Sequence, residues 1–66
     1  MFLKLTNGAS GFKVIEITAC AFRRFPEPAV DYHEVGTSED VTIKLSGHAF
    51  LLNNVGDTIE SFFIKR

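Results

Sequence analysis

The sequence predicts a β-rich α+β fold, in which a small antiparallel sheet of four or five strands is covered by a short C-terminal helix. Residues 41–52 alternate apolar and polar side chains around a Ser-Gly pair, which is typical of a β-hairpin. Residues 55–63 instead space their apolar side chains as one face of a helix does. With 66 residues, the chain is expected to form one small domain that spans residues 1–66.

The N-terminal part of the chain predicts two strands. A first strand is expected over residues 2–6, and a turn of small residues follows over 7–11. The next apolar run is rich in β-branched side chains up to Ile17, which favours a second strand. Residues 18–25 fit either a continuation of this strand or a short helix, and both alternatives stay open.

The middle of the chain predicts an edge strand between two turns. Residues 26–28 contain two prolines, which can neither donate to a ladder nor continue a helix. Residues 29–35 alternate weakly, with Val30 and Tyr32 in phase. The preceding prolines and the acidic residues of the segment suit a sheet edge. Residues 36–40 are polar and predict a turn.

The predicted hairpin has a definite register. Ser46-Gly47 supplies a two-residue turn, because glycine accepts the positive φ angle that such a turn requires. The turn places three cross-strand pairs on one apolar face: Leu45 with His48, Ile43 with Phe50, and Val41 with Leu52.

The predicted C-terminal helix has an apolar face and a cap. Its apolar side chains follow the spacing i, i+4, i+7 and i+8 at Val55, Ile59, Phe62 and Phe63. Asn54 is expected to cap its first turn, and Asp57 lies near the positive end of the helix dipole. Gly56 and Thr58 disfavour a helix, so a final strand over residues 62–64 is the alternative.

Composition limits the classes of partner. The formal net charge is −1 and the pI is about 6.0, which gives no general attraction to nucleic acid or anionic membranes. No segment approaches the length of a membrane span, and no signal peptide is evident, so a cytoplasmic location is expected. Seven phenylalanines are many for so short a chain, and we expect self-association to cover some of them.

The residues that could carry chemistry do not form a recognisable motif. Cys20, His33 and His48 lie near the acidic residues Asp31 and Glu34, but their spacing matches no zinc motif. The more ordinary interpretation is a cysteine that acts as a small hydrophobe and two histidines that reach solvent. No nucleophile and base can be paired from the sequence, so we expect neither an enzyme, nor a cofactor, nor a metal site.

One basic and aromatic cluster is a candidate binding site. Arg23 and Arg24 are flanked by Phe22 and Phe25, a combination that single-strand nucleic-acid binders use. The alternative is that the two arginines are solvent-exposed and form ion pairs with nearby acidic residues such as Asp31. The residues of the candidate interaction surface are Phe22, Arg23, Arg24, Phe25, Tyr32 and His48.

Short motifs resemble the small flagellar FlbD-type family, the group that includes SwrD. Residues 3–8 resemble the opening strand and Asn-Gly turn of that family, residues 41–47 its β-segment with a glycine turn, and residues 57–64 its closing apolar-acidic segment. The resemblance covers about half of the chain and extends to small phage and prophage proteins. It implies a small β-rich fold and supplies no active-site residues.

The expected function is that of a non-enzymatic interaction module. It would bind a protein partner and self-associate as a homo-oligomer, in keeping with a phage or prophage accessory protein. The alternative is a small β-barrel that binds nucleic acid through Arg23, Arg24 and the flanking aromatic residues.

Overall fold

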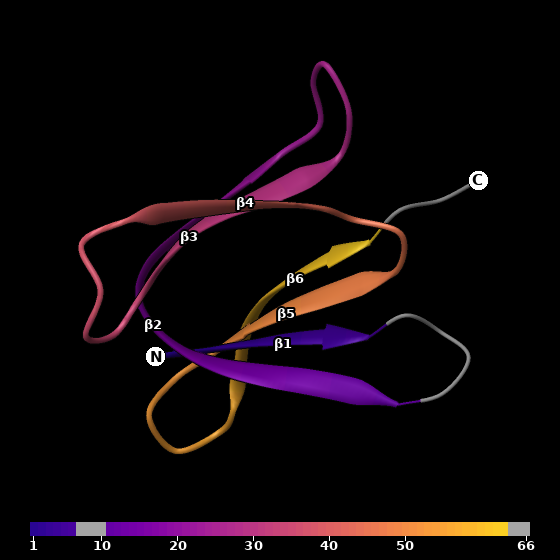
Figure 1. Cartoon of the computed structure of the whole chain (residues 1–66). Helices are drawn as coiled ribbons and strands as arrows, with labels where there is room; N and C mark the ends of the chain where they lie inside the picture. Colours follow the sequence, from indigo (N-terminus) through magenta and orange to yellow (C-terminus); the bar gives the residue numbers. More distant parts are fainter. Residues whose placement is uncertain (7–10, 64–66) are drawn as a thin grey trace.

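The computed structural model describes residues 1–6 and 11–63, and this part of the chain is all-β (Figure 1). It contains six antiparallel strands in one sheet: β1 (Phe2–Thr6), β2 (Phe12–Arg23), β3 (Ala29–Glu34), β4 (Asp40–Lys44), β5 (His48–Leu52) and β6 (Thr58–Phe63). The prediction of an α+β fold is therefore wrong, whereas the β-rich character is confirmed. The turn predicted over residues 7–11 lies outside the described residues except for Gly11.

The long strand β2 belongs to two layers of the sheet. The strand order is β4-β3-β2-β1-β5-β6, and Figure 1 shows β2 bending between the two layers. Its first half pairs with β1, and its second half pairs with β3. The register shifts between Ile17 and Ala19, so Thr18 occupies a β-bulge at the bend. Residues 18–23 are therefore strand and not helix, whereas Arg24 and Phe25 lie in the connection to β3.

The short connection between β4 and β5 requires a curved sheet. In a flat sheet, the four strand spacings from β4 to β5 would measure roughly 19 Å. The four backbone steps from Lys44 to His48 can cover at most about 15 Å. The sheet must therefore curl until the end of β4 meets the start of β5.

The hairpin predicted over residues 41–52 is wrong, although both of its strands exist. β4 pairs with β3, and β5 lies between β1 and β6. Ile43 is thus opposite Val30, and Phe50 is opposite Lys4. Residues 45–47 carry the chain from one edge of the β1–β4 meander to the other, and they do not form a hairpin turn.

The predicted C-terminal helix is wrong as well, because residues 53–57 form a turn and β6 follows. The Asn53 side-chain Oδ1 accepts hydrogen bonds of 2.9 Å from the backbone N–H groups of Val55 and Asp57. Gly56 has a φ angle of 96°, which a helix does not allow. Asn54 caps no helix; its side chain accepts a 2.8 Å hydrogen bond from the Met1 ammonium.

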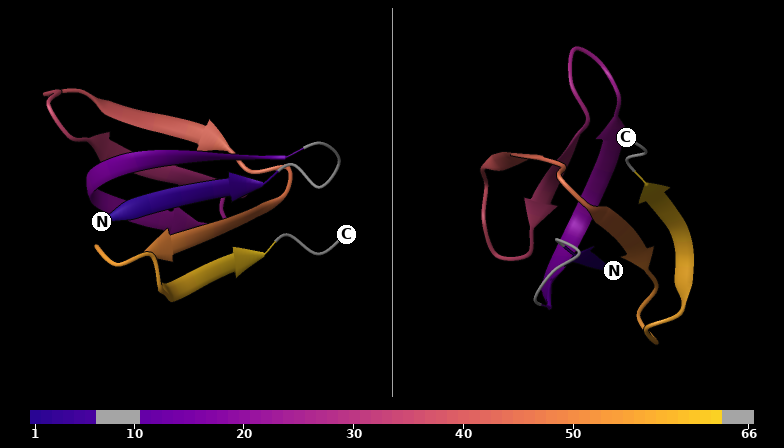
Figure 2. Two further views of the ribbon diagram at one scale, coloured as in Figure 1. Left: turned by 90° about the horizontal axis from the view of Figure 1, so that it is seen from below. Right: turned by 90° about the vertical axis from the view of Figure 1, so that its right-hand side faces the viewer.

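The core lies between the two layers of the curled sheet. Its buried members are Leu3, Ile15, Ile17, Ala29, Val30, Tyr32, Ala49 and Phe62. Three of the core residues come from the β3 segment, because this strand is covered on both sides by β2 and β4. The prediction of an edge strand at 29–35 is therefore wrong; β4 and β6 occupy the edges (Figure 2).

Candidate interaction surface

The outer face of the β2–β1–β5–β6 layer carries an unusual number of apolar side chains. Side chains directly opposite each other in a ladder point to the same face, so the register defines its rows. The first row joins Phe12, Thr6, His48 and Phe63; the second joins Val14, Lys4, Phe50 and Ser61; the third joins Glu16, Phe2, Leu52 and Thr58. We call this surface the aromatic face.

Contacts between its side chains confirm that these residues share one face. The Lys4 ammonium lies 4.6 Å from the ring centroid of Phe12 and 5.7 Å from that of Phe50. The His48 ring stacks on Phe50 at 4.2 Å and meets the edge of Phe63 at 5.2 Å. One lysine and a row of rings therefore form a continuous network over four strands.

The aromatic face is open to solvent at its two sides. Phe12 on β2 is 66% exposed, and Phe63 on β6 is 56% exposed. Val14 is also exposed, whereas Phe50 in the middle is half-buried by its neighbours. Exposed phenylalanines at both margins of one sheet face are characteristic of a binding surface rather than of scattered surface residues.

His48 lies at the centre of the first row without a polar partner for its Nε2 atom. This atom is buried and forms no hydrogen bond among the described residues. The expectation that the imidazole reaches solvent freely is wrong for Nε2, because the rings of Phe50 and Phe63 pack against it. His48 acts here as a member of the aromatic network.

The other residues of the surface that the sequence suggested are divided among different environments. Arg23 forms an ion pair with Asp31 at 3.5 Å, as the alternative interpretation expected. Arg24 lies over the ring of Phe62 at 4.6 Å. The two arginines therefore contact different neighbours, and each of them interacts with a side chain of the same molecule.

The aromatic members of that cluster also separate. Phe22 packs against the core and stacks on Phe62 with 5.2 Å between centroids. Tyr32 is buried in the core, whereas Phe25 is 84% exposed in the turn after β2. Of the six residues that the sequence suggested, His48 alone lies on the aromatic face.

Cys20 lies on the inner side of the sheet, opposite the buried Tyr32. Its side chain is partly buried against the core. Burial, together with the negative charges of Glu60 and Asp31, raises the pKa of the Cys20 thiol. The neutral thiol is the less nucleophilic form. His33 is opposite Ala19, one position along, and its side chain therefore points to the other face, so it cannot serve as a base for Cys20.

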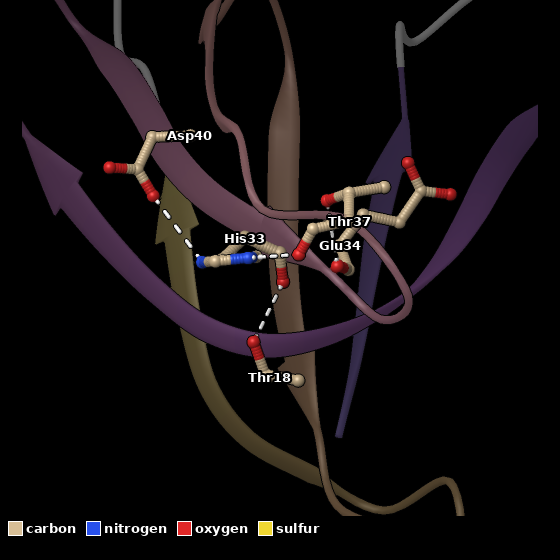
Figure 3. A network of polar contacts seen from close by, with 5 residues as sticks. All are labelled: Thr18, His33, Glu34, Thr37 and Asp40. Atoms are coloured by element: carbon tan, nitrogen blue, oxygen red, sulfur yellow. Dashed lines mark hydrogen bonds and ion pairs between the residues drawn. The ribbon is translucent and has the colours of Figure 1, made fainter.

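His33 instead belongs to a polar network that holds the turn between β3 and β4 (Figure 3). Its Nε2 contacts the backbone oxygen of Thr37, and its Nδ1 lies 3.5 Å from the Asp40 carboxylate. The hydroxyl of Thr37 donates to the Glu34 carbonyl at 3.0 Å, and that of Thr18 donates to the His33 carbonyl at 3.2 Å. Every contact in the network joins neighbouring strands or the turn itself, which indicates a structural role.

Two hollows lie outside the aromatic face. One of about 380 Å³ lies beside the connection from β4 to β5 and is lined in part by Lys13 and Lys44. Another of about 470 Å³ lies over β2 and β3 and is lined in part by Asp31, His33 and Thr42. Lys44 is engaged with Glu27 at 3.4 Å. Residues 1–6 and 11–63 contain no group of three side chains suited to a metal ion. They also include no helix with the length and apolarity needed to cross a bilayer.

Comparisons of the chain with protein-family models, with curated proteins and with solved structures find no match. The candidate site therefore rests on geometry alone. Sequence reasoning did not find the aromatic face for two reasons. It paired residues 48–52 with 41–45 instead of with β1, and it expected a helix where β6 lies. One sequence signal was available. Phe12 and Val14 are two residues apart, as are His48 and Phe50, so each pair lies on one face of its strand. The two pairs share a face because β1 lies between β2 and β5.

Proposed function

We propose that the chain is a non-enzymatic interaction module that binds protein through its aromatic face. The observation that supports this proposal is the exposure of Phe12 and Phe63 at the two margins of one apolar sheet surface. Aromatic residues concentrate in the centres of protein interfaces, where they provide a large contact area at a small cost in side-chain entropy.

The charges favour protein over nucleic acid as the partner. The twelve positions in the three rows of the aromatic face carry one lysine and one glutamate, Lys4 and Glu16. Nucleic-acid binding draws its affinity from several phosphate contacts by lysine or arginine. Arg23 and Arg24 do not add to the face, because they contact Asp31 and Phe62.

A capture experiment with matched variants tests the proposal. Immobilised wild-type protein, F12D, F63D and F25D are exposed to an extract of the source cells, and bound proteins are quantified by mass spectrometry. Phe25 is a suitable control, because it is even more exposed than Phe12 but lies outside the aromatic face.

We expect wild type and F25D to retain the same protein, either this chain or another, and F12D and F63D to lose it. Retention that is equal in all four variants would contradict a role for the face. Recovery of nucleic acid in place of protein would favour the alternative function.

A further inference from the structure

We propose that the aromatic face binds a second copy of this chain, forming a two-fold symmetric dimer in which the two faces pack against each other. This inference rests on the proposed function and names the partner of that same surface. Three features of the face carry it: the extent of its apolar area, the self-complementarity of its charges and the small size of the core beneath it.

The exposed area of the face reaches the lower range of a specific interface. With about 200 Å² for a fully exposed phenylalanine, Phe12 and Phe63 together expose about 240 Å². Val14 and the half-buried members of the three rows, which include the polar Thr6 and Lys4, bring the total exposed area of the face to the order of 500 Å². Two such faces in contact would bury about 1,000 Å² in total, the lower limit for a specific dimer.

The charges of the face are complementary to themselves. Lys4 is opposite Val14, and Glu16 lies two positions further along β2, so the two charges occupy adjacent rows of the face. Neither of them forms an ion pair within the described residues. In a two-fold interface, a contact of residue i with residue j occurs twice. Lys4 of each copy can thus meet Glu16 of the other, and the interface as a whole is neutral.

The monomer buries no more large apolar groups than it exposes. Among the described residues, six large apolar side chains are buried and eight are exposed, and three of the exposed ones, Phe12, Val14 and Phe63, lie on the aromatic face. A domain of this size has a marginal core, and oligomerisation is one of the means by which such domains gain stability. The single cysteine allows no disulfide within the chain.

Sedimentation velocity over a range of about 1–300 μM tests for the dimer. We expect wild type and F25D to change from monomer to dimer with increasing concentration, and F12D and F63D to remain monomeric. Each variant is first checked by circular dichroism. Because the two substituted phenylalanines on the face are exposed, both variants should fold.

A charge exchange tests the arrangement of the two copies. K4E and E16K each place like charges in contact across the proposed interface and should weaken the dimer by about tenfold or more. The double variant K4E/E16K restores opposite charges and should recover most of the lost affinity. Additive weakening in the double variant would overturn the paired arrangement.

The outcomes separate this inference from the proposed function. A strictly monomeric wild type at all concentrations would overturn the dimer, whereas capture of a different protein that depends on Phe12 would leave the proposed function in place. A dimer that F12D and F63D leave intact would also overturn it, since the copies would then meet elsewhere. Sedimentation of wild type with a single-stranded oligonucleotide distinguishes a nucleic-acid platform, which would bind the oligonucleotide and fail to dimerise.

Discussion

Two adjacent phenylalanines at the end of β6 have opposite roles. Phe62 is 8% exposed and contacts Phe22 and Arg24, whereas Phe63 points to the aromatic face. Truncating a buried phenylalanine removes its transfer free energy and leaves a cavity. We therefore expect F62A to lower the free energy of unfolding by about 3 kcal/mol or more.

The matched variant is F63A, which removes the same atoms from the neighbouring position. Urea denaturation below 1 μM, where association contributes little, should show a change of less than about 1 kcal/mol for F63A. Equal losses in the two variants would mean that the faces of β6 are assigned incorrectly.

The partly buried Cys20 and the buried Tyr32 predict a loss of stability at alkaline pH. The pKa of Cys20 is raised above its usual value of 9.0, and the pKa of Tyr32 is raised above its usual value of 10.0. Burial is the main cause of both shifts. The folded state therefore keeps these protons at a pH where the unfolded chain releases them. The stabilisation is complete below pH 9 and decreases as the pH rises through and beyond the ordinary values.

Thermal melts between pH 7 and pH 11 measure this effect. Wild type should lose stability progressively above about pH 9, and C20A should show a smaller loss between pH 9 and pH 10 relative to its own value at pH 7. If the two proteins have parallel profiles over that interval, Cys20 does not contribute.

At the level of the elements, the turn between β5 and β6 depends on backbone conformation. Gly56 has a φ angle of 96°, and a Cβ atom at this position would meet nothing within 4 Å. A substitution there is thus opposed by backbone strain alone, of about 1–2 kcal/mol for a bulky residue. G56V should be destabilised by about that amount and G56N by less, because asparagine tolerates positive φ better. Equal denaturation midpoints for G56V and wild type would show that the turn adopts another conformation.

Local patterns predicted most strands but not their partners. Residues 2–6, 41–44 and 48–52 are strands as predicted, because period-two alternation is a local property of the chain. Pairing is not local. Ser46-Gly47 has the composition of a hairpin turn, but β5 pairs with β1 and β4 pairs with β3, so the partners depend on residues far away in the sequence.

The C-terminal error has a different cause. The predicted helical face consisted of Val55, Ile59, Phe62 and Phe63. In the structure Val55 lies in the turn, Ile59 in a bulge, and Phe62 and Phe63 on opposite faces of β6, with only Phe62 in the core. Val55, Ile59 and Phe63 are exposed, so the helical spacing does not describe one shared buried face. In the sequence, Gly56 disfavoured a helix, and the β-branched Thr58 and Ile59 favoured a strand.

At the scale of the whole molecule, the distribution of charge predicts weak contact with nucleic acid. The net charge is −1, and the two adjacent arginines contact Asp31 and Phe62. We expect no binding of single- or double-stranded oligonucleotides at about 150 mM salt, where charges are screened beyond about 8 Å. Fluorescence anisotropy with wild type and the R23A/R24A variant measures this. Submicromolar, salt-sensitive binding that the double substitution abolishes would establish the alternative function.

The three-residue connection between β4 and β5 also affects how the chain can fold. The ladder of β1 with β5 joins residues far apart in sequence, such as Thr6 and His48, which are 42 positions apart. Closing so long a loop in one step would be slow. Once the local pairing of β1 through β4 has formed and curled, however, the end of β4 already lies near β1. Only the three residues between Lys44 and His48 then remain to be ordered before β5 can pair with β1. The β1–β5 pairing joins residues far apart in the sequence, but at this stage it requires the closure of only a short loop.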